Sequence, residues 1–510
     1  MLKKILVLGN NDRDTDDRVD ALAVELQTIN HGLIIDEDFV PDIPGYYHSS
    51  VADLPWGALV GLAQRFDEIV MLDQPRENWS NWKCLLGTFK VMCHLEKLGK
   101  ITIFRENQNI KAFQYWIKLQ EDNKSFCLYP WVNKFIKYGD LMPCARASAP
   151  VTKLEDLTSW KDDPKFRELR NKMLAGEKLP TTCDTCYYYE EKNIESYRQF
   201  ESLDWVAKLG LNDISDLEKI DQPYYYEMHT SNICNIKCRG CSPTWSNQID
   251  KEFRKFNISP PKGIDWRPLT DFSILENIDI DQLSPAHRVY FQGGEPTIMP
   301  GVLDFMKECV RRKKTEFELS MCTNGMVLSQ EFLEVSKHFP LLNFSFSIDG
   351  FGKINDYWRW GSKWDKVIQN AKLVRELGHK LSINTVPGIY NVTNLHLLFE
   401  FLDQTFPDTA VYLQINYVDS QSVFNHPMPE LAVESMEKCK KTLMYHSDAK
   451  SCKTCIDSLY DYYSGDPKVD LVDLETFFKF NDRLDEIRGS KLIDYIPELE
   501  QCRKFLKQQR

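Results

Sequence analysis

The pattern of apolar and polar residues divides the chain into four stretches. In residues 1–115, strand-like apolar runs alternate with stretches whose apolar side chains recur at helical spacing. The strand-like runs are 3–9, 66–73 and 100–106, and the helical stretches are 18–27 and 79–98. Strands that alternate with helices in this order predict a small N-terminal α/β domain with a parallel sheet.

The second stretch, residues 116–222, is less periodic and is rich in Cys, Tyr, Trp and Pro. We expect an irregular module there, held together by a metal site rather than by a large apolar core. The last stretch, residues 421–510, is charged and helical, and residues 472–488 form its clearest amphipathic segment.

Residues 223–420 carry six strand-like runs, and helical patterns separate most of them. The runs are YYYEMHT (224–230), HRVYF (287–291), FELSMCT (317–323), LNFSFSID (342–349), LSINTVP (381–387) and VYLQINYV (411–418). The clearest helical patterns are 301–313, 329–339 and 365–377. Six strand–helix units predict an α/β fold of the TIM-like kind, a partial (β/α)6 barrel. In such barrels the chemistry gathers on the loops after the C-terminal ends of the strands.

Composition and charge narrow the class of protein. A chain of 510 residues has room for two or three domains of about 150 residues each. No run approaches the roughly 20 apolar residues that span a bilayer, and the apolar run 5–8 is too short for a signal peptide. We therefore expect a cytoplasmic protein with no membrane partner. A net charge of −12, with both signs mixed along the chain, argues against a broad nucleic-acid-binding surface.

The chain has fifteen cysteines, and three of them follow the first barrel strand closely: Cys234, Cys238 and Cys241. In a reducing compartment, closely spaced cysteines are more often metal ligands or catalytic groups than disulfides. A 4Fe–4S cluster normally takes four thiolates, so three leave one iron open to a substrate or cofactor. Gly240 lets the short loop turn tightly. From these residues alone two alternatives stay open, namely three ordinary thiols or a zinc loop completed by His229.

The CxxxCxxC spacing resembles that of the radical S-adenosylmethionine (AdoMet) superfamily. In that superfamily AdoMet chelates the open iron, and an electron from the 4Fe–4S cluster cleaves it to a 5′-deoxyadenosyl radical. The resemblance implies that Cys234, Cys238 and Cys241 are the cluster ligands.

The ends of the later strands extend the resemblance. Gly293, Gly294 and Glu295, followed by Pro296, match the GGEP motif, which contacts the AdoMet amino group in the family. Two glycines bring a backbone close to a ligand, and a carboxylate pairs with an ammonium. The resemblance further implies that polar residues at the next strand ends line the AdoMet site. These are Thr323, Asn324, Ser347, Asp349 and Asn384. Taken singly, Asn-Gly and Asp-Gly are also simply good turns, and Cys322 precedes the first of these loops.

A second cysteine set lies upstream, at Cys127, Cys144, Cys183 and Cys186. Four thiolates satisfy either a complete 4Fe–4S cluster or a structural zinc, and unconnected buried thiols are the alternative. The set resembles the auxiliary iron–sulfur modules of SPASM and twitch radical AdoMet proteins. More narrowly, it resembles those encoded by tailed phages, in which the module precedes the barrel. The phage resemblance would place the protein in the host cytoplasm.

Further segments share that narrower resemblance. They are Trp358–Trp364, the run Asp485–Gly489, and Pro497-Glu-Leu. One departure from that group is Ala145, because a second cysteine often follows the one at the position of Cys144. The set therefore has only the four candidate ligands that a complete cluster needs. Cys452 and Cys455 lie in a polar helical region, where we expect a solvated or incidental pair. Their alternative role is to complete or replace part of the auxiliary set.

Three functions follow from these patterns. The leading one is a radical AdoMet enzyme that abstracts hydrogen from an unidentified substrate, which is a peptide, a protein or a small molecule. Such an enzyme needs an electron donor such as flavodoxin or ferredoxin. The second is a non-catalytic iron–sulfur protein for electron transfer or redox sensing, and the third is a zinc-stabilised scaffold. The GGEP motif favours the first, because an electron carrier has no use for an AdoMet pocket.

Overall fold

The computed structural model divides into two compact units, each formed by discontinuous segments. Unit 1 contains Met1–Asn133, Met142–Thr152 and Asp156–Pro223, and unit 2 contains Lys134–Leu141, Lys153–Glu155 and Tyr224–Arg510. The structure describes the backbone of four N-terminal strands and, beyond them, these residues: 108–157, 159–191, 196–229, 231–258, 273–407, 409–413, 422–443, 450–465 and 467–509.

The N-terminal strands form a small parallel sheet in unit 1. Its order is β2 (Ile34–Ile35), β1 (Lys4–Leu8), β3 (Glu68–Met71) and β4 (Ile101–Ile103). The strands predicted at 3–9, 66–73 and 100–106 are confirmed as β1, β3 and β4. The helices predicted at 18–27 and 79–98 lie outside the described residues.

The rest of unit 1 is mostly helical, so the expectation of an irregular module at 116–222 is wrong in this respect. Its helices are α4 (Gln108–Asp122), α5 (Tyr129–Val132), α6 (Pro164–Leu174), α7 (Pro180–Glu191) and α8 (Tyr197–Leu209). Side chains that cap the N-termini explain helices that the spacing of apolar residues did not predict. The Asp163 side chain accepts hydrogen bonds from the N–H groups of Lys165 and Phe166, and Ser196 forms a capping box with Gln199.

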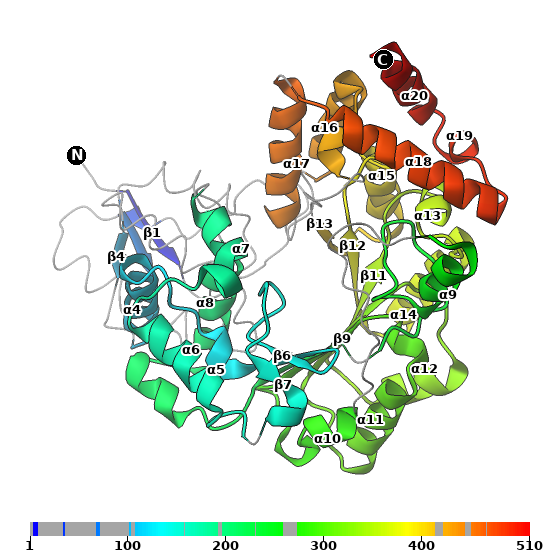
Figure 1. Cartoon of the computed structure of the whole chain (residues 1–510). Coiled ribbons are helices and arrows are strands. Elements are labelled where there is room, and N and C mark those ends of the chain that lie inside the picture. Colours follow the sequence, from blue (N-terminus) through cyan, green and yellow to red (C-terminus); the bar gives the residue numbers. More distant parts are fainter. Residues whose placement is uncertain are drawn as a thin grey trace. The chain divides into compact units, whose positions relative to one another are not determined.

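Unit 2 is built on a larger sheet of nine strands, most of which belong to it (Figure 1). Its order is β13 (Ala410–Leu413), β12 (Lys380–Thr385), β11 (Leu342–Ser347), β10 (Glu318–Thr323), β9 (Arg288–Gln292), β8 (Tyr225–His229), β5 (Asn133–Lys137), β6 (Asp140–Met142) and β7 (Thr152–Lys153). Strands β8 to β13 pair in parallel in sequence order. All six predicted barrel strands are therefore confirmed. The sheet is open, because β13 and β8 are not hydrogen-bonded neighbours.

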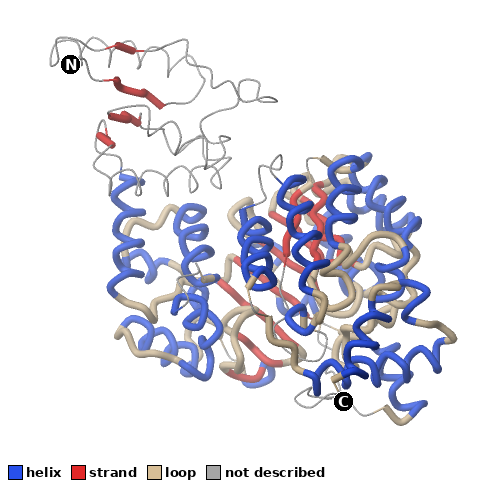
Figure 2. The backbone as a smooth tube through the Cα atoms, turned by 90° about the horizontal axis from the view of Figure 1, so that it is seen from above, coloured by secondary structure: helices blue, strands red, loops and turns tan. Residues whose placement is uncertain are grey.

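Alternation along these strands gives the sheet one apolar and one polar face. Phe291 of β9 packs edge-on against Phe305 of α11 (Pro300–Arg311), with ring centroids 5.5 Å apart. Phe344 of β11 packs against Phe332 of α12 (Gln330–Ser336) with tilted rings whose centroids are 6.2 Å apart. Figure 2 shows the strands in red among such helices in blue. Ser347 at the end of β11 and Asn384 near the end of β12 lie on the opposite face from their buried neighbours Phe346 and Ile383.

The C-terminal stretch forms five helices against this sheet domain. They are α16 (Pro429–Leu443), α17 (Lys450–Ser464), α18 (Leu471–Arg488), α19 (Leu492–Tyr495) and α20 (Leu499–Gln508). The predicted amphipathic segment is α18, whose Phe477 ring lies 5.0 Å from the Tyr390 ring. Cys452 and Cys455 are buried on α17, so the pair is not solvated, and an incidental pair remains the prediction. Among the described helices, none is long and apolar enough to cross a membrane.

Candidate metal centre

The three predicted ligands lie on an irregular loop that joins β8 to α9 (Asn247–Phe256). Hydrogen bonds within the loop shape it. The Cys241 N–H donates to the Cys238 carbonyl oxygen (3.2 Å), and the Cys234 N–H donates to Asn247 Oδ1 (3.2 Å). The loop therefore starts at the C-terminal end of the first parallel strand, where a barrel places its chemistry.

The three thiols face one another inside the protein. Burial raises the pKa of Cys234 to about 12, and the Cys238 thiol adds to the rise. Burial also raises the pKa of Cys241 well above its ordinary value, and Cys238 and Cys234 both raise it further. The predicted cysteines therefore influence one another electrostatically; Cys234 is buried, and Cys238 and Cys241 are partly exposed.

No three His, Cys, Asp or Glu side chains of the described residues surround a point where a single metal ion would sit. A cluster makes a different demand, because each of its irons takes its own thiolate. The proposed fourth zinc ligand, His229, lies among aromatic rings instead. Its ring centroid is 4.9 Å from those of Phe135 and Trp245, and burial lowers its pKa to about 3.

The two glycines of the GGEP motif pack against the cysteine loop. The Gly294 N–H donates to the Ser231 carbonyl oxygen (2.9 Å), and the Glu295 N–H donates to that of Ile233 (2.7 Å). A Cβ atom on Gly294 would lie 2.2 Å from the Ile233 carbonyl oxygen. Glycine is therefore required here by the approach of two backbone segments. The sequence analysis had instead explained the glycines of this motif by the close approach of a ligand.

Glu295 is the hub that joins this turn to the next strand end. Its fully buried carboxylate accepts hydrogen bonds from Thr297 Oγ1 and Thr323 Oγ1, both at 2.7 Å, and from the Asn324 N–H (2.7 Å). Burial raises the pKa of Glu295, and these donors oppose the rise. The Glu295 carboxylate therefore already accepts several hydrogen bonds from the protein itself. Through them Glu295 positions the end of the third strand, in addition to any contact with AdoMet.

The later strand ends converge on the same loop and on one another. Asn324 Nδ2 donates to Asn235 Oδ1 (2.8 Å) and lies 3.9 Å from Cys234 Sγ. Cys322 Sγ lies 3.3 Å from Ser347 Oγ and accepts from Asn384 Nδ2 at 3.8 Å. Asn324, Ser347 and Asn384 therefore take part in contacts with the cysteine loop or between neighbouring strand ends.

Asp349 is held by an arginine that the sequence analysis did not assign to the site. Arg359 Nη1 lies 2.5 Å from Asp349 Oδ2, and the Val386 N–H donates to Asp349 Oδ1 (2.9 Å). Arg359 also acts to lower the pKa of Cys234, Cys238 and Cys241 against the larger effect of burial. The only sequence signal for it was its place in the Trp358–Trp364 motif.

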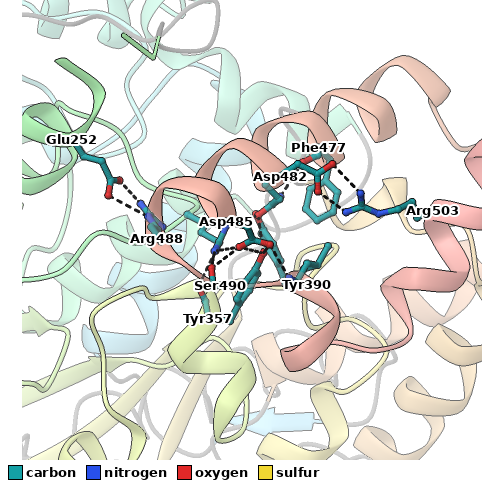
Figure 3. Close-up of polar contacts among 12 residues, drawn as sticks. Glu252, Tyr357, Tyr390, Phe477, Asp482, Asp485, Arg488, Ser490 and Arg503 are labelled. Atoms are coloured by element: carbon teal, nitrogen blue, oxygen red, sulfur yellow. Dashed lines mark hydrogen bonds and ion pairs between the residues drawn. The ribbon is translucent and has the colours of Figure 1, made fainter. Parts of the chain in front are cut away.

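Arg239, between two of the cysteines, anchors the loop to α18 (Figure 3 shows its partners). Its buried guanidinium lies 3.7 Å above the Tyr357 ring. Nη1 donates to Asn481 Oδ1 (3.0 Å) and Nη2 to Asp485 Oδ1 (2.6 Å). The loop is therefore held by residues more than 240 positions away in the chain, and no local motif could have revealed them.

The residues present fit an anionic metal–thiolate group. Two buried guanidinium nitrogens beside the triad, Arg359 Nε and Arg488 Nη1, have no hydrogen-bond partner among the described residues. Buried donors normally have partners. Both arginines act to lower the pKa of Cys238, although burial raises it overall. A negatively charged centre held by the thiolates would supply the missing counter-charge.

The four upstream cysteines also come together, within unit 1. Burial raises the pKa of Cys144 well above its ordinary value, and Cys127, Cys186 and Cys183 each raise it further. Beside them lies buried Arg198, whose Nη1 donates to the Phe126 carbonyl oxygen (2.6 Å). Cys183 and Cys186 share α7. The structure thus gathers four thiols from three separate segments next to one cation.

Comparison with known proteins identifies the sheet domain. Residues 228–402 match the sequence model of the Radical SAM superfamily. An S-adenosylmethionine-dependent nucleotide dehydratase of Pseudoalteromonas ulvae is 26% identical over 181 residues, which are 33% of this chain and 57% of that protein. A GTP 3′,8-cyclase of Rippkaea orientalis is 27% identical over 174 residues, which are 32% of this chain and 48% of that protein. The chain thus spans about half the length of these curated relatives.

Solved structures show weaker similarity. Streptococcus suis SuiB bound to S-adenosylmethionine has a TM-score of 0.32 and 16% identity, covering 54% of this chain and 63% of that one. Native anSMEcpe with bound AdoMet has a TM-score of 0.31 and 16% identity, covering 42% and 58%. Both curated relatives carry the names of enzymes. The cysteine loop and strands β9 to β12 thus lie within the residues that match the Radical SAM superfamily.

Proposed function

We propose that the protein is a radical AdoMet enzyme whose 4Fe–4S cluster is held by Cys234, Cys238 and Cys241. The observation that carries the proposal is the set of three thiols on one loop, which raise one another's pKa, beside guanidinium nitrogens that have no hydrogen-bond partner among the described residues. When bound, such a cluster offers one open iron to AdoMet and supplies the electron that cleaves it to a 5′-deoxyadenosyl radical.

The chain's own residues position and shield this chemistry. Glu295 and Asn324 hold the second and third strand ends against the cysteine loop. Ser347 and Asn384 offer hydroxyl and amide groups on the polar face of the sheet. These groups suit the ribose and methionine parts of AdoMet, and burial of the surrounding loops keeps water from a reactive radical.

The substrate is an unidentified peptide, protein or small molecule, and the electron donor is a flavodoxin or ferredoxin. The names of the curated relatives add nucleotides to the small molecules worth testing. We place the reaction in the cytoplasm, which is the host cytoplasm if the chain is phage-encoded.

We further propose that Cys127, Cys144, Cys183 and Cys186 hold a second, auxiliary iron–sulfur cluster. Their mutual effects on pKa and the neighbouring Arg198 support the assignment. Four thiolates saturate a 4Fe–4S cluster, which favours electron transfer or a structural role over substrate binding. On this proposal the chain resembles the twitch and SPASM radical AdoMet proteins encoded by tailed phages.

Anaerobic reconstitution tests both sites. After reduction with dithionite, the wild-type protein should bind about eight irons if both sites are 4Fe–4S and convert AdoMet to 5′-deoxyadenosine. Cys234→Ala should abolish the conversion and keep the auxiliary iron. Cys183→Ala should lose the auxiliary iron only. Cys309→Ala, a buried thiol on α11, is the matched control and should lose neither. Retained 5′-deoxyadenosine formation in Cys234→Ala would refute the ligand assignment.

The outcome also decides between enzyme and electron carrier. Two clusters without any 5′-deoxyadenosine would support a non-catalytic iron–sulfur protein. Zinc in place of iron would support a structural scaffold.

A further inference from the structure

We propose that Arg488, the last residue of α18, is a positioning residue that raises the reduction potential of the metal centre through Cys238. The inference rests on the proposed function, because it requires a cluster at the triad. It assigns the C-terminal helices a part in the electron chemistry of a site whose ligands lie about 250 residues earlier.

The first argument is that both chain neighbours of Cys238 are tied to the end of α18. Lys237 Nζ lies 2.7 Å from Glu252 Oε1, and Glu252 Oε2 lies 2.6 Å from Arg488 Nη2. On the other side, Arg239 Nη2 lies 2.6 Å from Asp485 Oδ1. Figure 3 shows the Glu252–Arg488 pair and Asp485 at the same helix end. The geometry therefore brings this helix end to the Cys238 segment.

The second argument is burial. The Arg488 side chain is 1% exposed and that of Glu252 is 4% exposed. The Trp360 ring lies 5.7 Å from the Arg488 guanidinium and 5.8 Å from that of Arg239, and the Trp360 carbonyl oxygen accepts the Lys237 N–H (2.7 Å). A charge in such a place acts through protein rather than water, so its effect on a nearby group is strong.

The third argument is charge balance around Cys238. Arg239 pairs with Asp485 and Arg359 pairs with Asp349. Lys237 and Arg488, in contrast, share the one carboxylate of Glu252. Arg488 Nη1 in addition has no hydrogen-bond partner among the described residues. The end of α18 thus presents an incompletely neutralised cation to the thiol segment.

The effect on reduction follows from electrostatics. Reduction moves one electron from the donor to the centre, with no bond broken and no proton required. The reduced centre is more negative, so a buried cation stabilises it more than the oxidised centre. Net charge and hydrogen bonds to the sulfurs are known determinants of iron–sulfur potentials. Arg488 should therefore raise the potential, and Glu252 should lower it.

The test is a redox titration of the reconstituted full-length protein, followed by the electron paramagnetic resonance signal that Cys234→Ala removes. We expect Arg488→Gln to lower the equilibrium constant for reduction about tenfold, which is about 59 mV for one electron. Glu252→Gln should shift it in the opposite direction, and Arg488→Lys should restore the wild-type value. Arg483→Gln is the matched control, since Arg483 lies on the same helix but is 48% exposed.

The outcomes are separable. If Cys234→Ala removes no cluster signal, the proposed function fails and the inference falls with it. If the signal is present and Arg488→Gln, Glu252→Gln and Arg483→Gln share one potential, the inference alone is overturned. If Arg488→Gln does not retain iron, Glu252→Gln and Arg488→Lys decide. A higher reduction potential in Glu252→Gln together with the wild-type potential in Arg488→Lys supports the inference. Any other combination of the two results refutes it.

Discussion

At the scale of single residues, the site depends on where backbones approach most closely. Gly294 stands against the carbonyl group of Ile233, one residue before the first cysteine of the triad. Its backbone conformation is one that other residues can adopt, so only space requires glycine here. Gly378 is the opposite case. Its φ is +83°, yet no heavy atom lies within 4 Å of the position a Cβ would take.

We expect Gly294→Ala to displace the cysteine loop, because the added methyl group would lie 2.2 Å from a carbonyl oxygen. Iron bound at the triad should fall by more than half. Gly378→Ala should cost about 1 kcal/mol of stability through its positive φ and leave iron binding unchanged. Iron per chain and the thermal midpoint of each variant check the prediction, which fails if both lose iron equally.

At the scale of elements, the cysteine loop and helix α18 form one polar connection. Asp485 accepts hydrogen bonds from Arg239 Nη2, Ser490 Oγ (2.6 Å) and the Leu492 N–H (2.7 Å). Its helix neighbour Asp482 instead pairs with Arg503 near the surface, and the Asp482 side chain is 51% exposed. Figure 3 shows both carboxylates on α18.

The two carboxylates should differ sharply in their contribution to stability. Asp485→Asn leaves the buried Arg239 cation without its carboxylate, and the expected loss is about 3–5 kcal/mol. Asp482→Asn breaks an exposed ion pair, for which the expected loss is below about 1 kcal/mol. Urea unfolding of both variants, followed by tryptophan fluorescence, measures the difference. Equal midpoints would show that Arg239 is held by its other contacts.

At the scale of the whole molecule, burial of ionisable groups sets how the fold responds to pH. His229, at the end of β8, and His426, before α16, are both buried in unit 2. Burial lowers the pKa of each to about 3 from the ordinary 6.5. The unfolded chain therefore binds more protons than the folded chain between these values. The free energy of unfolding should decrease as the pH falls from 6.5 towards 3.

His426→Gln should flatten this dependence. At pH 5.5 the single histidine should account for about 1.4 kcal/mol of the loss relative to neutral pH, because one pH unit is worth that much per proton. Exposed His338→Gln is the control and should keep the wild-type slope. Chemical unfolding at pH 7.5 and 5.5 gives the slopes, and parallel curves for wild type and His426→Gln would contradict the prediction.

The sequence by itself determined the parallel sheet and the position of the cysteines on it. Strands β9 and β10 were predictable because each buries one face, and burial of one face imposes a pattern with a period of two residues. Strand β8 is buried along its whole length, and its apolar and aromatic residues indicated it. The order of strands β8 to β13 required nothing further, since consecutive parallel strands with helical crossovers lie side by side. The helices of residues 116–222 were missed because local capping groups such as Asp163 and Ser196 define them.

Only the tertiary structure decided what surrounds the cysteines. Arg239 belongs to the cysteine loop, whereas Arg359 and Arg488 come from two distant parts of the chain, and Asp485 is 246 positions from Arg239, which it binds. Glu295 likewise binds Thr323 and Asn324 within the protein, and His229 lies among aromatic rings. Periodicity reports burial along one element, whereas the partners of a buried charge depend on how distant elements pack. That packing is the physical reason why the ligands were visible in the sequence and the charges around them were not.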